Sequence, residues 1–264
     1  MRWFFDCARR YRSVRIDDAR TPINAAKRSA GEDPSLCAFG VIALFLPLAA
    51  NAARPMITDD ARVVDTKACQ AESWVKFNKN GEEYWALPAC NFTGNFELTL
   101  GGAVGKDETG SSATDIVFQG KTLLKPLKTN GYGVGLAFGY VAHSAINPNR
   151  NLLGDFYGYV PVSFSFEEDR HVLHTNLGFL HSREKNTVNM TWGLGMEIQA
   201  VSNLFVIAET FGQSQGEFYY QAGLRYWIMP GHIQLDTTYG DRFGWGGDSR
   251  WFSIGLRLIS APFL

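Results

Sequence analysis

Two short patterns in the 264-residue sequence have the residue types of known functional motifs. The run Gly212-Gln213-Ser214-Gln215-Gly216 matches G-x-S-x-G, in which the serine is a nucleophile on a turn between a strand and a helix. Here the pattern joins two segments with strand alternation, so it predicts a flexible loop. Gly131, Gly133 and Gly135 resemble a dinucleotide-binding loop, but they lie inside an alternating segment that no helix follows. They are better explained as small residues on one strand face.

Histidine chemistry gives one enzymatic alternative. None of the five histidines, His143, His171, His174, His181 and His232, has a metal-ligand spacing, so we expect no metal and no cofactor. His174 could serve a lipid-modifying barrel enzyme, with Ser163 or Ser165 as nucleophile on a neighbouring strand and Glu197 as the acid. His174 is equally suited to hydrogen bonding inside a barrel. We expect no enzyme and keep a lipid hydrolase as the alternative.

A set of charged residues is more informative. Its members all fall on the small, polar face of alternating segments, near the same end of each: Glu72, Glu97, Lys121, Glu197, Glu209, Arg225, Asp236 and Arg257. Ionisable groups facing lipid are costly, so in a membrane barrel these side chains should point inward and pair. Two interpretations stay open, a salt-bridge network that stiffens a narrow barrel and a constriction that selects solutes. We expect Arg225 to bridge Glu209 and Asp236, with Arg257 sharing Asp236 and continuing to Glu72.

The segments that carry these residues alternate with a period of two. In Trp251 to Leu258, Phe252, Ile254, Leu256 and Leu258 share one face, while Ser253, Gly255 and Arg257 share the other. Most such segments reach the roughly 9 to 11 residues that a tilted strand needs to cross a bilayer. About twelve strands are predicted, near 70–78, 82–89, 95–104, 114–124, 131–143, 155–166, 171–182, 188–200, 204–212, 218–229, 233–240 and 251–259.

The connections favour a membrane barrel. Short links alternate with longer loops at 106–113, 144–154 and 241–250, which is typical of outer-membrane barrels. Aromatic residues gather at strand ends, as in the girdles at membrane interfaces. A secreted β-sandwich is the alternative, but its apolar face would point inward and leave no packed or wet lumen for the polar face. We therefore predict an all-β, antiparallel transmembrane β-barrel over residues 69–264, with both ends in the periplasm.

The first residues predict export. Ala38 to Ala52 form an apolar run that ends in Ala-Asn-Ala and is too short for a membrane-spanning helix, as expected for a signal peptide cleaved after Ala52. Residues 1–52 are thus leader and signal peptide, and residues 1–35 are best explained by a misassigned start, with a true long leader as the alternative. Residues 53–68 lack strand alternation and predict a periplasmic arm or a plug. The net charge of −1 leaves no basic excess for nucleic acid.

Two cysteines remain after cleavage. Cys69 and Cys90 lie at equal distances from an Asn-Lys-Asn-Gly turn, and a hairpin centred between residues 79 and 80 sets Trp74 opposite Trp85. A turn at Asn80-Gly81 is the competing register, but it separates these pairs. The first register brings the two cysteines within disulfide reach near the periplasmic base of the hairpin, in an oxidising compartment.

The segment "RPMITDDARVVD", Arg54 to Asp65, and the last strand "WFSIGLRL" carry a resemblance to a known family. On these residues the chain resembles the outer-membrane barrels named for the MetA pathway of phenol degradation. The resemblance implies a channel or transporter for small solutes, including aromatic or hydrophobic compounds, and brings no catalytic motif. We expect a monomer in the outer membrane of a Gram-negative bacterium, in contact with outer-membrane lipid, the barrel-assembly machinery and a small-molecule solute. A structural barrel without transport is a further alternative.

Overall fold

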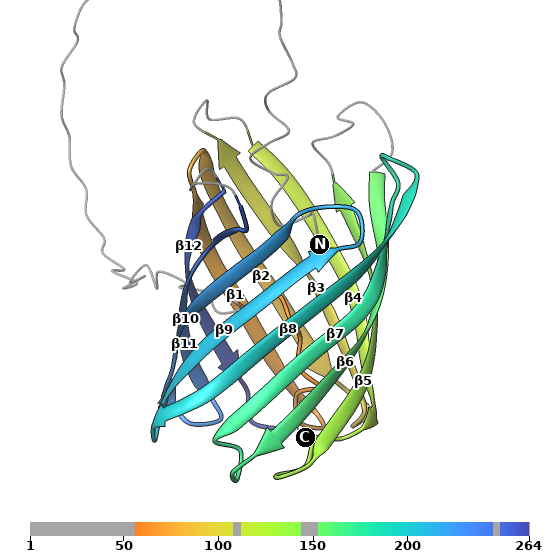
Figure 1. Ribbon diagram of the computed structural model, residues 1–264. Coiled ribbons are helices and arrows are strands. Elements are labelled where there is room, and N and C mark those ends of the chain that lie inside the picture. The colour runs from red at the N-terminus through yellow and green to blue at the C-terminus, as the bar shows by residue number, and fades with distance from the viewer. Residues whose placement is uncertain (1–55, 108–111, 144–152, 245–248, 264) are drawn as a thin grey trace, which may run out of the picture. The chain divides into compact units, whose positions relative to one another are not determined.

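The computed structural model describes residues 56–107, 112–143, 153–244 and 249–263, so the predicted leader and signal peptide lie outside the described residues. Twelve strands form one closed antiparallel barrel, in which each strand pairs with its sequence neighbours and the first pairs with the last (Figure 1). The predicted all-β barrel is confirmed. The strands are β1 (Ala68–Asn78), β2 (Gly81–Asn91), β3 (Phe96–Asp107), β4 (Ser112–Lys125), β5 (Tyr132–His143), β6 (Leu153–Phe166), β7 (His171–Ser182), β8 (Thr187–Val201), β9 (Leu204–Gln213), β10 (Phe218–Met229), β11 (Ile233–Arg242) and β12 (Trp251–Ile259).

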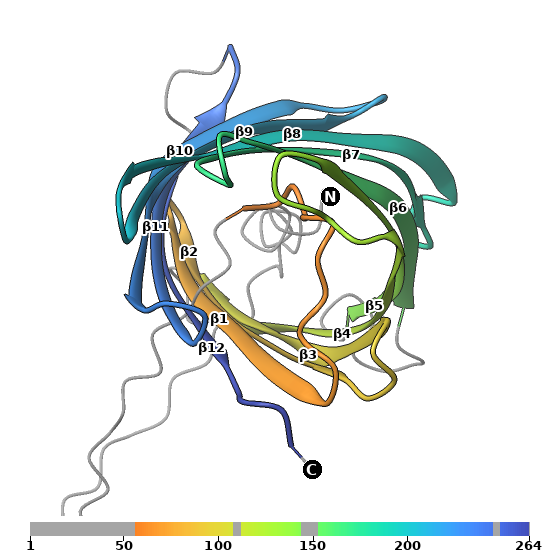
Figure 2. The same cartoon turned by 90° about the horizontal axis from the view of Figure 1, so that it is seen from below.

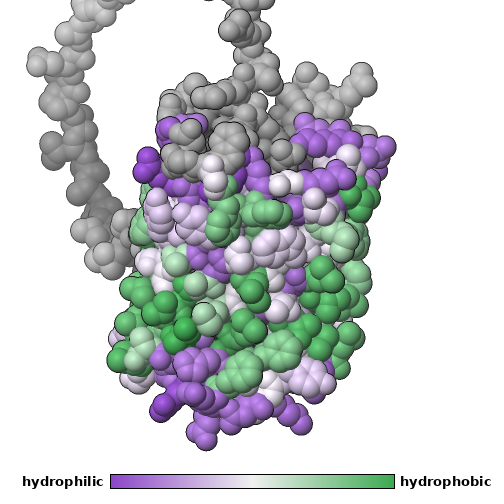
Figure 3. All heavy atoms as spheres, in the orientation of Figure 1, coloured by the Kyte–Doolittle hydropathy of each residue, from purple (hydrophilic) through white to green (hydrophobic). Residues whose placement is uncertain are grey.

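Alternation along each strand separates the lipid-facing side from the lumen. In β10, Tyr220, Leu224 and Tyr226 are exposed on the outside, whereas Gln221 is buried on the inside. On the face drawn in Figure 3, the outer surface carries a hydrophobic band between hydrophilic ends. A closed barrel has no unpaired edge and can therefore face hydrocarbon. The chain is an outer-membrane barrel, and the location predicted from the sequence is confirmed. In the described part of the chain, no helix is long and apolar enough to cross a membrane.

The two ends of the barrel can be told apart by their connections. Links 92–95, 126–131, 167–170, 202–203 and 230–232 lie at the end where β1 begins and β12 stops, the lower end in Figure 1. Outer-membrane barrels carry their short turns on the periplasmic side, so we call this the periplasmic end.

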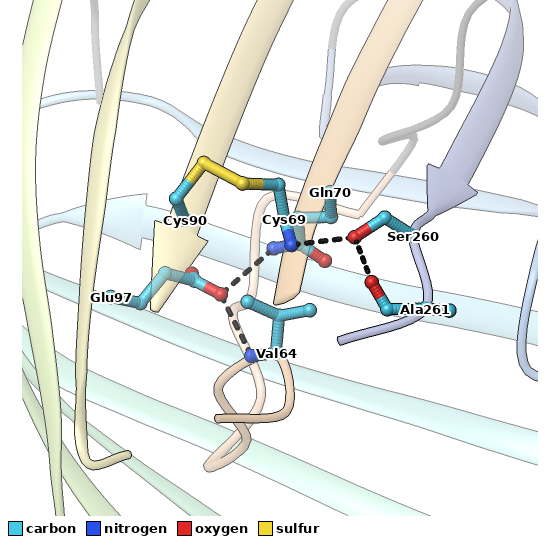
Figure 4. The surroundings of a disulfide bond; sticks show 7 residues. All are labelled: Val64, Cys69, Gln70, Cys90, Glu97, Ser260 and Ala261. Atoms are coloured by element: carbon cyan, nitrogen blue, oxygen red, sulfur yellow. Dashed lines mark hydrogen bonds between the residues drawn. A yellow bond between two sulfur atoms is a disulfide. The ribbon is translucent and has the colours of Figure 1, made fainter. Parts of the chain in front are cut away.

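The first hairpin has the predicted register. Trp74 pairs with Trp85 and Lys76 with Glu83, and the two tryptophan rings stack at 5.3 Å between centroids. The structure contains the Cys69–Cys90 disulfide at the periplasmic base of this hairpin (Figure 4). The competing turn at Asn80-Gly81 is excluded, because Asn78 pairs with Gly81 across a two-residue turn.

The disulfide should stabilise the barrel through its closed loop. The cysteines lie 21 residues apart, and closing a loop of that length contributes about 3 kcal/mol by the chain-entropy estimate. We expect replacement of both cysteines by serine to lower the free energy of unfolding by about that amount and to weaken the first hairpin while the other strands stay paired. Thiol labelling of the denatured mature chain should find free cysteine only after reduction. Full labelling without a reductant would refute the bridge.

Apolar side chains partly fill the lumen in two clusters. One cluster, here called the apolar collar, runs along the inner wall from β1 to β7 and consists of Trp74, Trp85, Leu87, Ala103, Val117, Val141 and Leu180, with Tyr157 packed against it. A second cluster joins Phe211, Tyr219 and Trp251 on β9, β10 and β12. These side chains narrow the barrel interior beyond what the alternation alone indicates.

Candidate functional site

Residues 56–64, here called the lumenal segment, lie inside the barrel. Figure 2 shows the chain before β1 crossing the opening that the strands enclose. Met56, Ala61 and Val64 are buried, and Ile57 packs against the cluster of Phe211, Tyr219 and Trp251. The segment has no strand alternation, and its backbone N–H groups bind side chains of the wall rather than a neighbouring strand.

Carboxylates and a hydroxyl of the wall hold this segment by its backbone. Glu209 on β9 accepts hydrogen bonds from the backbone N–H of Ile57 and of Thr58, each at 2.6 Å. Further along, Ala61 N–H donates to Ser163 Oγ at 2.8 Å, and Val64 N–H donates to Glu97 Oε2 at 2.9 Å. Hydrogen bonds to a charged acceptor are stronger than neutral ones. Two of the predicted charged residues, Glu97 and Glu209, thus bind the lumenal segment.

The side chain of Asp59 forms an ion pair with the barrel wall. Lys121 Nζ on β4 lies 2.9 Å from Asp59 Oδ1 and 3.2 Å from Asp60 Oδ1. Tyr159 OH donates to Asp59 Oδ2 at 2.6 Å. Asn176 on β7 accepts from Asp59 N–H at 2.7 Å and donates to its carbonyl oxygen at 2.8 Å. Lys121, predicted as a lumenal charge, is therefore paired with the lumenal segment, and on the wall it lies opposite Glu97 of β3.

Two inward-facing glycines of β8 let the segment approach the wall closely. A Cβ atom at Gly193 would lie 2.6 Å from Thr58 Oγ1, and one at Gly195 would lie 2.5 Å from Met56 Cε. Such distances are shorter than van der Waals contact, so larger side chains at these positions would push the segment away from β8. The strand face that carries these glycines therefore provides the space that residues 56 and 58 occupy.

Arg225 lies at the centre of an ion-pair network, but with one partner that differs from the expectation. Its Nη2 lies 2.9 Å from Asp236 Oδ2, and its Nε donates to both Asp236 oxygens at 3.1 and 3.2 Å. Its Nη1 reaches Glu197 Oε1 on β8 at 2.6 Å. The second carboxylate is therefore Glu197 and not Glu209, because Glu209 is directed to the lumenal segment and the guanidinium reaches across β9 to the next strand.

Arg257 also differs from the expectation in part. It lies 3.6 Å from Glu72, the predicted partner across the seam between β12 and β1. Its Nε and Nη2 donate to Gln70 Oε1 at 2.8 and 2.6 Å, so Gln70 takes the place that was predicted for Asp236. Asp236 instead accepts a further hydrogen bond from Gln234 Nε2 at 2.9 Å.

Ser163, His174 and Glu197 meet in one chain of contacts. Ser163 Oγ lies 2.8 Å from His174 Nδ1, and His174 Nε2 lies 3.1 Å from Glu197 Oε1. These are the residue types of a hydrolytic triad. However, Ser163 is fully buried on the lumenal face, and its Oγ accepts the Ala61 N–H. With the lumenal segment in place, this series of contacts links the segment to Arg225, and Ser163 faces neither lipid nor open solvent.

The other sequence motifs have structural roles. Residues 214–216 of the G-x-S-x-G pattern form the bend between β9 and β10, as predicted. Gly133 and Gly135 lie inside β5 and are buried, whereas Gly131, predicted in the same strand, lies in the bend before it. Within the described ranges, no group of three or more His, Cys, Asp or Glu side chains is placed to hold a metal ion.

A cavity of about 150 Å³ lies in the lumen beside these residues. Its wall includes the apolar collar residues Trp74, Trp85 and Val141, and the lumenal segment from Met56 to Asp60 borders it. Of the predicted charged residues, Glu72, Glu97, Lys121, Glu197, Arg225 and Arg257 line this cavity. The cavity therefore joins an apolar, aromatic wall to a band of mixed charge.

Sequence reasoning missed the residues that recognise the lumenal segment, above all Asn176 and Tyr159. A neutral amide and a phenol on alternating strands look like ordinary lumenal residues. The pair Asp59-Asp60, in a segment without alternation, could have indicated such partners. An acidic pair that enters a barrel needs a cation and hydrogen-bond donors on the wall.

Comparisons with known proteins agree with this fold. A family model described as "Uncharacterised conserved protein UCP029691" matches residues 40–259. No curated protein matches the sequence. The solved structure "KdgM porin in complex with disordered oligogalacturonate" is similar with a TM-score of 0.54 and 11% identity, covering 72% of this chain and 98% of that one. The NanC porin is similar with a TM-score of 0.52 and 10% identity, covering 73% and 100%. At these identities the likeness shows the fold alone.

Proposed function

Since this chain belongs to the family described as uncharacterised conserved protein UCP029691 and folds as an outer-membrane barrel, we propose that it is a narrow channel or transporter for small solutes. The observation that carries the proposal is a lumenal cavity bordered by a segment that noncovalent contacts hold to the wall. In this proposal the lumenal segment is a plug, and its release opens the barrel. The similar KdgM and NanC structures are both porins, which supports the same class of function.

The wall of the cavity suggests which solutes pass. The stacked pair of Trp74 and Trp85 and the stacked pair of Tyr157 and Tyr159, with centroids 6.1 Å apart, offer flat apolar surfaces. Such surfaces favour partly apolar or aromatic solutes over small hydrated ions. The sequence resemblance to the phenol-degradation barrels supports the same choice. In this proposal the barrel works as a monomer, in contact with outer-membrane lipid and inserted by the barrel-assembly machinery.

Planar-bilayer recording of two forms of the purified barrel tests the proposal. We expect the full mature chain to be mostly closed and a variant lacking residues 56–64 to conduct in steps of defined size, because the deletion removes the obstruction from the lumen. Glu83→Gln is the control, since the contacts of Glu83 with Lys76, Asn78 and Trp85 stay within the first hairpin.

Absence of conductance in a folded deletion variant would contradict the channel proposal. Silence together with lipid hydrolysis would favour the enzyme alternative, which the contacts among Ser163, His174 and Glu197 make specific. Replacing Ser163 by alanine should then abolish the hydrolysis. Silence without hydrolysis would favour a structural barrel.

A further inference from the structure

The barrel wall contacts Asp59 through both its carboxylate and its backbone. Lys121 and Tyr159 each bind one of its carboxylate oxygens, at 2.9 and 2.6 Å. The Asn176 side chain binds both its backbone N–H and its carbonyl oxygen, at 2.7 and 2.8 Å. Four polar groups of one residue are thus matched by three side chains that come from β4, β6 and β7.

These three wall residues form a built site. The Lys121 side chain is only 4% exposed, and Asn176 is buried. Tyr159 is positioned independently of the segment, because its ring stacks on Tyr157 and its hydroxyl lies 3.3 Å from Gln119 Oε1. The lining of the lumenal cavity includes all three side chains together with Asp59. A molecule in the cavity would therefore reach this site as soon as residue 59 moved aside.

We propose that Lys121, Tyr159 and Asn176 form a binding site for a small carboxylate that also carries a secondary amide, such as an N-acylated acidic amino acid, and that Asp59 occupies it as a tethered ligand. The ammonium and the phenol bind the carboxylate, and the asparagine amide pairs with the N–H and the carbonyl of the ligand. An acyl group on the ligand nitrogen would extend into the cavity, which the apolar collar borders. The inference rests on the proposed channel function for the passage of the ligand, but binding can be measured separately.

Competition between ligand and segment follows from this arrangement. A tethered group has an effective concentration in the millimolar range, so a free ligand must displace it and binds with reduced apparent affinity. Asp60 also contacts Lys121, so both aspartates compete with the ligand's carboxylate. Replacing Asp59 and Asp60 together by alanine should therefore free Lys121 and Tyr159 for the carboxylate of the ligand without changing any wall residue, while the backbone of residue 59 still competes for Asn176.

Calorimetric titration of the folded barrel with N-acetyl-L-aspartate α-amide tests the site. We expect the Asp59→Ala/Asp60→Ala barrel to bind this probe about tenfold or more tightly than the unsubstituted barrel. N-acetyl-L-asparagine α-amide has the same shape without the charge and should bind about tenfold or more weakly, because the ion pair is lost. Adding Asn176→Leu or Lys121→Met to the double-alanine barrel should abolish binding of the charged probe, whereas Glu83→Gln should leave it unchanged.

The outcomes separate this inference from the channel proposal. Absence of binding to a folded double-alanine barrel, or equal binding of the charged and uncharged probes, overturns the inference even if the barrel conducts. Charge-dependent binding that Asn176→Leu abolishes supports the inference even if bilayer recordings stay silent, in which case the channel proposal alone fails. Conversion of each variant between its fast- and slow-migrating gel forms on heating shows that it is folded before titration.

Discussion

Replacing Glu209 with alanine is expected to release the lumenal segment and raise the fraction of conducting barrels about a hundredfold. Glu209 accepts the N–H groups of Ile57 and Thr58, each at 2.6 Å, and a hydrogen bond to a charged group contributes about 1.5 to 3 kcal/mol. Loss of both would cost the closed state about 3 kcal/mol or more, and each 1.4 kcal/mol is a factor of ten. The substitution also favours the open state. In the unsubstituted barrel, release of the segment leaves the buried Glu209 carboxylate without these two donors, whereas the alanine variant has no carboxylate there.

Glu209→Gln and Glu83→Gln are the matched variants for this experiment. Glutamine keeps an oxygen that accepts one N–H and should open the barrel less than alanine does. Glu83→Gln also removes a lumenal carboxylate, but at a site whose contacts lie in the first hairpin, and should leave conduction unchanged. A folded Glu209→Ala barrel with the conductance of the unsubstituted barrel would show that these two hydrogen bonds do not close the lumen.

The recordings can be compared across a range of pH from about 5 to 8. Burial alone would raise the pKa of Asp60, but the surrounding cations, of which Lys121 acts most strongly, together outweigh burial and hold the pKa well below its usual value. A carboxyl group whose pKa is lowered in the closed state stabilises that state at every pH above the ordinary pKa of the group. This stabilisation is lost only when the pH falls through the lowered pKa. The ion pair that holds the segment to Lys121 therefore persists throughout that range.

The strands and the first hairpin could be predicted because lipid imposes a strict pattern. Each residue that faces hydrocarbon must be apolar and its neighbour must face the lumen, so a strand such as β12 shows its orientation in its sequence. The register of the first hairpin was predictable from Trp74 and Trp85, because stacked aromatic pairs occur between directly opposed positions.

The partners within the lumen could not be predicted in the same way. Strands in a barrel are tilted and staggered, so residues at equal depth along neighbouring strands need not meet. Arg225 is long enough to pass β9 and reach Glu197 on β8. The expected partner Glu209 is occupied by backbone N–H groups of a segment that has no periodic pattern. A segment whose structure depends on its surroundings leaves little local signal of where it binds.

Arg225→Ala is expected to destabilise the barrel by about 3 to 5 kcal/mol, the usual cost of removing one partner from a buried ion pair. Asp236 is fully buried and would lose three guanidinium contacts, keeping Gln234 as a donor. Glu197 would lose its contact at 2.6 Å and keep His174. The variant should convert to its slow-migrating gel form at a lower temperature than the unsubstituted barrel. In an open channel, loss of this fixed positive charge should also shift selectivity toward cations.

Three further variants separate the ion pairs from the loss of side-chain volume. Arg225→Lys keeps the charge but not the planar fork that binds Asp236, so it should recover only part of the stability. Arg225→Met with Glu197→Gln and Asp236→Asn removes all three charges together and should recover most of it, because no unpaired carboxylate remains. Arg257→Ala, at a side chain that is 20% exposed, removes a carboxylate contact at 3.6 Å and the donors to the neutral Gln70, and should cost less, about 1 to 3 kcal/mol. If Arg225→Ala converted at the same temperature as the unsubstituted barrel, water rather than Arg225 would be stabilising both carboxylates.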